Sequence, residues 1–130
     1  MASAINNFIL SRTRLLFWLS FSATNVALFM PSVGSKGEFY NLDIIIHYVM
    51  FTVFAGSAFL HFHKDSSRTL VILVAFAFFV ALSEFIQEML IPGRGYEFTD
   101  ILSGLAGVLS GFLVFEVWKK NSHFIEFIRE

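Results

Sequence analysis

Residues 83–111 read SEFIQEMLIPGRGYEFTDILSGLAGVLSG, so that two apolar runs meet at a short turn over residues 92–95. The first run ends with Glu84 and Gln87, and the second begins at Asp100 and is rich in glycine and serine. An ionisable side chain inside a membrane span costs about 2.5–3.5 kcal/mol on insertion scales, so it is a functional hypothesis by default. We therefore expect the polar positions of this stretch to belong to a functional site.

The composition is typical of an integral membrane protein. Of the 130 residues, 56% are hydrophobic and 15% are charged, whereas a soluble domain has about 45–50% apolar and about 25% charged residues. The net charge of -1 gives no electrostatic support for a nucleic-acid partner. The chain has no cysteine, which excludes thiol nucleophiles, disulfides and cysteine-ligated metals.

Four apolar runs are predicted to span the membrane, since a span needs about 20 such residues. They cover residues 15–30, 42–62, 69–91 and 100–118. The first run follows a basic head, as in a signal peptide, but no small-x-small cleavage site follows it, so we expect a retained helix. The predicted fold is an all-α, integral membrane four-helix bundle that forms one domain over residues 15–118.

The two ends of the chain are predicted to lie outside this bundle. Residues 1–14 form a short head, and residues 119–130 form a tail that is first basic and then amphipathic. Four tail residues would share one helical face, which suits a short C-terminal helix at the membrane interface; they are Phe124, Ile125, Phe127 and Ile128. A frayed terminus is the alternative.

Lysine and arginine are distributed unevenly between the predicted loops. With the N-terminus in the cytoplasm, seven of the nine lie in the cytoplasmic segments, and the outer loops hold only Lys36 and Arg94. Cytoplasmic segments carry the excess of these residues in membrane proteins. We therefore predict a multi-pass protein of the inner or plasma membrane with both termini in the cytoplasm. The loops over residues 31–41 and 92–99 then lie on the outer side.

Polar residues of different spans are predicted to converge. At about 1.5 Å of rise per residue, one layer holds Asn25, His47 and Glu84 at a common depth. The layer above it, nearer the outer surface, holds Asp43, Gln87, Arg94 and Asp100. Asp43 and His47 are four residues apart and share a helix face. Polar groups in hydrocarbon need partners, so these faces should turn towards one another.

A stripe of small residues follows Asp100. Ser103, Gly107 and Gly111 recur every four residues, and such stripes let a neighbouring helix approach closely. We expect the neighbour to be another helix of the same chain. A homodimer through the same three residues is the alternative.

Three interpretations of the polar residues remain open. In the first, they form a hydrogen-bonded network that only fixes the register of the helices. In the second, they line a binding site that opens to the outer leaflet. There Arg94 would anchor a phosphate or carboxylate through two hydrogen bonds, and the acidic and histidine groups would accept polar groups of the ligand.

The third interpretation is catalysis. His47 oriented by Asp43 would act as a base and Glu84 as an acid. A metal variant would use His47, Glu84 and Asp100 with Asp43 as nitrogen and oxygen ligands, although Asp-x-x-x-His alone is a weak metal signal. We predict no cofactor and assign no metal ligands from the sequence.

The combined pattern resembles the VanZ-like membrane proteins. It consists of Asp43-x3-His47, Glu84-x2-Gln87, Pro92-Gly93-Arg94, Asp100 and Gly107-x3-Gly111, and the similarity covers about residues 15–115. The recurrent polar positions of that family correspond to Asp43, His47, Glu84, Gln87, Arg94 and Asp100. Ile44 and Gly104 depart from it, where the family often has lysine and asparagine.

The resemblance implies a compact helical membrane protein associated with low-level resistance to glycopeptide antibiotics, teicoplanin more than vancomycin. We therefore expect an envelope protein that contacts membrane lipids. It would recognise an amphiphile at the outer leaflet, either a glycopeptide or other lipopeptide-like drug or a lipid-linked envelope precursor. A membrane-embedded hydrolase or transferase and a purely structural membrane subunit are the alternatives.

Overall fold

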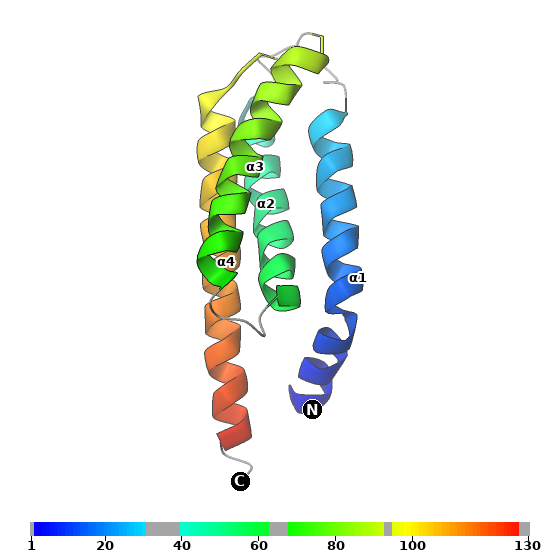
Figure 1. Ribbon diagram of the computed structural model, residues 1–130, viewed down its shortest axis with the longest axis vertical. Coiled ribbons are helices and arrows are strands. Elements are labelled where there is room, and N and C mark those ends of the chain that lie inside the picture. The colour runs from blue at the N-terminus through cyan, green and yellow to red at the C-terminus, as the bar shows by residue number, and fades with distance from the viewer. Residues whose placement is uncertain (1, 31–39, 63–67, 93–94, 128–130) are drawn as a thin grey trace.

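The computed structural model describes residues 2–30, 40–62, 68–92 and 95–127. Within these ranges the chain forms four helices and no strand (Figure 1). The helices are α1 (Ala2–Phe29), α2 (Tyr40–Phe62), α3 (Thr69–Leu90) and α4 (Phe98–Phe127). The predicted all-α fold is therefore confirmed.

The first and last helices are longer than the apolar runs that predicted them. α1 begins at Ala2, so the head predicted over residues 1–14 is part of one continuous helix rather than a separate element. α4 continues through the predicted tail to Phe127, without a break at residue 119. Neither segment contains glycine or proline, so nothing in the backbone stops the helix where the apolar residues end. The side chains of the predicted interfacial face lie outside the described residues.

Three of the four helices are long and apolar enough to cross a membrane. Among the described residues these segments are Leu42–Phe62, Thr69–Leu90 and Phe98–Asn121. α1 is not among them, because its first half carries polar residues such as Asn6, Asn7 and Arg12. Three helices of this kind are the pattern of a membrane protein.

The helices run alternately up and down along the long axis of the molecule (Figure 1). The beginning of α1 and the end of α4 lie at the same end, and α4 extends beyond α2 and α3 there. With 30 residues, α4 is about 45 Å long, whereas the hydrocarbon core of a bilayer is about 30 Å thick. The closest packing in the bundle is between α2 and α4, while α1 lies mainly against α2.

Phe54 of α2 is the centre of an aromatic cluster that joins three helices. Its ring centroid lies 5.9 Å from that of Phe17 and 5.6 Å from that of Phe21, both in α1. On the other side it lies 4.7 Å from Phe76 and 5.9 Å from Phe79 of α3. Aromatic pairs at these separations add about 0.5–1.5 kcal/mol each beyond the burial of their surface.

The outward faces of α2, α3 and α4 are also apolar. Large hydrophobic side chains between 56% and 67% exposed include Val53, Val74, Phe78, Leu109 and Leu113. Extensive apolar surface on a folded chain marks contact with another apolar phase. With three helices of spanning length, that phase is the lipid bilayer.

The glycine stripe of α4 lies directly against the backbone of α2. A Cβ atom added to Gly111 would be 2.6 Å from the carbonyl oxygen of Thr52 and 2.8 Å from the backbone nitrogen of Gly56. A Cβ atom on Gly107 would overlap the carbonyl oxygen of Tyr48. The stripe is thus occupied within the chain, as intramolecular packing predicts. A homodimer through it would need a surface that α2 already covers.

This contact generates a stability prediction for purified protein in detergent. Replacing Gly111 with alanine forces the two backbones apart, which we expect to cost about 1–3 kcal/mol. Gly111→Ala should therefore lower the midpoint of thermal unfolding. Gly56→Ala is the matched control from the same interface, because its Cβ atom would meet the Gly111 carbonyl oxygen at an ordinary 3.7 Å. Equal midpoints for the two variants would contradict the backbone contact.

Candidate functional site

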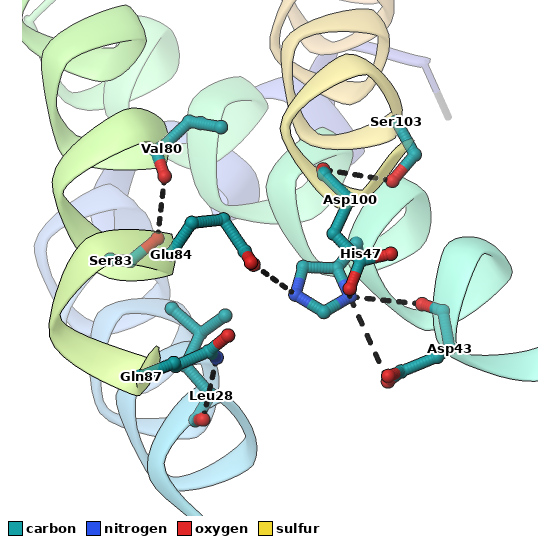
Figure 2. Close-up of polar contacts among 9 residues, drawn as sticks. All are labelled: Leu28, Asp43, His47, Val80, Ser83, Glu84, Gln87, Asp100 and Ser103. Atoms are coloured by element: carbon teal, nitrogen blue, oxygen red, sulfur yellow. Dashed lines mark hydrogen bonds and ion pairs between the residues drawn. The ribbon is translucent and has the colours of Figure 1, made fainter. Parts of the chain in front are cut away.

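His47 is the centre of the polar cluster, and it is 1% exposed. It lies on α2 and faces Glu84 of α3, with 3.3 Å between His47 Nε2 and Glu84 Oε1 (Figure 2). The Glu84 side chain is 2% exposed. The structure thus brings together two residues that were predicted to lie at one depth, and it buries both.

The other nitrogen of the imidazole ring faces three oxygen atoms. His47 Nδ1 is 2.9 Å from the carbonyl oxygen of Asp43, 3.8 Å from Asp43 Oδ1 and 3.9 Å from Asp100 Oδ2. The Asp100 side chain is 3% exposed, whereas that of Asp43 is 38% exposed and reaches the surface. The ring therefore lies between a buried carboxylate on one side and a pair of carboxylates on the other (Figure 2).

The positions of these residues follow from helix geometry. Asp43 and His47 are one turn apart on α2, so their side chains lie on the same face. Asp43 and Asp100 both lie in the first turn of their helices, where the backbone dipole favours negative side chains. Because α2 and α4 begin at the same end of the bundle, their first turns place the two aspartates near each other (Figure 1).

Packing among the described residues leaves the cluster incompletely paired. Among the described residues, three buried side-chain atoms have no hydrogen-bond partner: His47 Nε2, Glu84 Oε1 and Asp100 Oδ1. The 3.3 Å contact between Nε2 and Oε1 is electrostatic and lacks the geometry of a hydrogen bond. A buried polar atom without a partner costs about 1–3 kcal/mol. A network that served only to fix helix register would be expected to satisfy its own members.

The cluster is also strongly acidic. Three carboxyl groups surround one imidazole, and two of these carboxyl groups are nearly inaccessible to water. Charges removed from water need opposite charges or protons nearby. The arrangement can therefore hold protons, accept hydrogen bonds from a donor-rich ligand, or bind a cation.

Gln87 makes a hydrogen bond that was not predicted, while its place in the binding site stays a prediction. It is 1% exposed, and its Nε2 donates a 2.6 Å hydrogen bond to the carbonyl oxygen of Leu28. Leu28 lies in the last turn of α1, where carbonyl groups have no partner within the helix. Gln87 thus links the end of α1 to α3 and helps to position the cluster. The sequence carried no signal for this bond, because its acceptor is a backbone atom.

Two other predicted site residues are not seen in contact with His47. Asn25 Nδ2 donates to the carbonyl oxygen of Phe21, 2.8 Å away in its own helix. Arg94 lies outside the described residues, so its role as an anion anchor stays a prediction.

The Gln87 bond generates a second stability prediction. Gln87→Met keeps the size of the side chain but removes the donor, and we expect it to cost about 1 kcal/mol of unfolding free energy. Glu88→Met introduces the same side chain at the exposed next position and should leave the unfolding free energy unchanged. Thermal unfolding in detergent measures both. If Gln87→Met and Glu88→Met unfold at the same temperature, the bond does not hold α1 to α3.

Comparison of the chain with models of protein families, with curated proteins and with solved structures finds no match. The VanZ-like resemblance therefore rests on the spacing of the polar residues.

Proposed function

We propose that this chain is a VanZ-like protein of the plasma membrane that recognises the polar head of an amphiphile at the outer leaflet. The observation that carries the proposal is the buried and incompletely paired cluster of His47, Glu84 and Asp100. Buried polar groups inside a membrane protein are expensive and mark functional sites by default. A ligand that supplies the missing partners would offset that cost.

In this proposal all four helices cross the membrane and both termini are cytoplasmic. Of the described basic residues, Arg12, Arg14, Lys119 and Lys120 lie in the lower parts of α1 and α4, towards the end of the bundle that holds both chain ends (Figure 1). Basic residues favour the cytoplasmic side. Asp43 and Asp100 lie near the opposite end, in the first turns of α2 and α4. The cluster is then close to the outer surface.

The chemistry of the cluster favours a ligand rich in hydrogen-bond donors. Carboxylate oxygens accept hydrogen bonds, and those from charged donors are the stronger ones. Sugar hydroxyls, amides and amines of a glycopeptide or of a lipid-linked envelope precursor offer such donors. Asp43 is the group of the cluster that reaches the surface, so it would meet the ligand first. Arg94 would hold an anionic group of the same ligand.

A membrane-embedded hydrolase or transferase is the second candidate, and the environment of His47 favours it. The Nδ1 contact with the Asp43 carbonyl oxygen orients the ring, as a general base requires. Nε2 would then exchange a proton with the substrate, and Glu84 beside it would supply or accept a second one.

Drug protection tests the proposed function. We expect the native chain, expressed in a teicoplanin-sensitive host, to raise the lowest inhibitory concentration of the drug. Glu84→Gln should abolish the increase, because it changes the charge beside His47 Nε2 with little change in shape. Glu88→Gln is the matched control, the same substitution at an exposed position one turn along α3. With membrane abundance equal, protection by Glu84→Gln as strong as that by Glu88→Gln would make Glu84 a packing residue.

Reporter fusions test the proposed topology. Green fluorescent protein fused to the C-terminus should be fluorescent, because it folds in the cytoplasm. Alkaline phosphatase fused within residues 31–39 should be active, because it needs the outer compartment. The opposite pair of results would place the cluster at the inner surface and contradict recognition at the outer leaflet.

A further inference from the structure

The two nitrogens of His47 cannot both be satisfied by a neutral ring that lies beside an ionised Glu84. A neutral imidazole has one N–H, and the other nitrogen carries a lone pair. Since Nδ1 lies 2.9 Å from the carbonyl oxygen of Asp43, the proton of this arrangement is on Nδ1. The lone pair of Nε2 then faces Glu84 Oε1 at 3.3 Å, and neither atom has a hydrogen-bond partner.

In the other tautomer the proton is on Nε2 and points towards Glu84, and a small movement of the Glu84 carboxylate would complete a hydrogen bond. The lone pair of Nδ1 then faces the carbonyl oxygen and Oδ1 of Asp43 and Oδ2 of Asp100. A nitrogen lone pair and several oxygen atoms that converge in this way are typical of a cation site. Either an additional proton on the His47–Glu84 pair or a metal ion at Nδ1 would therefore satisfy the ring.

The geometry points to a divalent metal ion held by Asp43, His47 and Asp100. One ligand atom from each of these three residues lies within 4.8 Å of the other two. Metal bonds of about 2.0–2.2 Å to nitrogen and oxygen bring neighbouring ligands somewhat closer than that. The Asp43 side chain is 38% exposed, and its rotation would close the remaining gap.

Two further observations support an ion over a bare acidic cluster. Asp100 Oδ1 is buried in a side chain only 3% exposed and has no hydrogen-bond partner. Glu84 lies where a carboxylate commonly supports a metal-bound histidine, accepting the N–H of the nitrogen that does not bind the metal. Metal binding at Nδ1 would thus place the ring proton on Nε2, and a small movement of Glu84 would pair it with Oε1.

The ligand set indicates which ion. One imidazole and two carboxylates form a mixed nitrogen and oxygen site, which suits Zn²⁺ or Mn²⁺ better than Mg²⁺ or Ca²⁺. We expect Zn²⁺ to bind more tightly than Mn²⁺, as the order of affinities for first-row metals requires. Three protein ligands leave at least one coordination position open. On the proposed function, that position would bind a phosphate or carboxylate of the amphiphile.

Metal binding is tested directly on the full chain in detergent, without reference to the amphiphile. The protein is stripped with a chelator and titrated with Zn²⁺, and bound metal is measured by elemental analysis after gel filtration. We expect about one tightly bound ion per chain and a higher unfolding temperature with Zn²⁺ than with the chelator. Asp100→Asn should weaken binding at least about 10-fold, and Glu84→Gln should weaken it by a smaller factor.

Two further variants show whether Zn²⁺ binds at this cluster and not elsewhere on the chain. Glu88→Gln removes a carboxylate from an exposed position and should bind Zn²⁺ as the native chain does. Asp43→Asn lies at the surface end of the site, so it should lose affinity even if Asp100→Asn does not fold. The inference is overturned if the native chain shows no saturable binding, or if the folded aspartate variants bind as tightly as Glu88→Gln. Drug protection is measured separately. If the protein binds no metal but still protects the host, the metal site is overturned and the proposed recognition of an amphiphile is not.

Discussion

The need to satisfy His47 on both sides governs the arrangement of this bundle. The ring is buried where α2, α3 and α4 meet, and each of these helices contributes one or more oxygen atoms to it. In a low-dielectric interior an unpaired polar atom is costly, so the three helices cannot slide or rotate independently without increasing that cost. The same requirement makes the cluster able to bind, because a proton, a metal ion or a donor-rich ligand would each supply partners to its unpaired atoms in a different way.

The glycine contact supplies the rigidity on which this site depends. Gly107 and Gly111 bring the backbone of α4 against that of α2 one to three turns below the cluster. The two helices that carry Asp43, His47 and Asp100 therefore form one firmly packed pair. α3 brings Glu84 to that pair, and the bond from Gln87 to Leu28 ties α3 to α1. Functional groups placed on helices in this way are held more precisely than groups on loops.

The sequence predicted much of this arrangement, because membrane helices follow simple rules of spacing and burial. The four-residue separation of Asp43 and His47 and the depth of Glu84 were sufficient to place these three residues together. Asp100 was predicted in the layer directly above His47, and its Oδ2 lies 3.9 Å from His47 Nδ1. The hydrogen bond of Gln87 was not predicted, because its partner is a backbone carbonyl group that no residue pattern reveals. α1 and α4 are longer than the predicted spans. Hydrophobicity indicates which residues can lie in the membrane, whereas glycine, proline and capping residues limit the length of a helix.

The polarity of α1 has a consequence for biogenesis. α1 is synthesised first, yet it is not among the helices that are long and apolar enough to cross a membrane. Its place in the fold comes from α2, through the 2.6 Å contact between the hydroxyl oxygens of Ser20 and Ser57 and through the rings around Phe54. In the proposed topology, in which all four helices cross the membrane, α1 would therefore insert together with α2 as a helical hairpin.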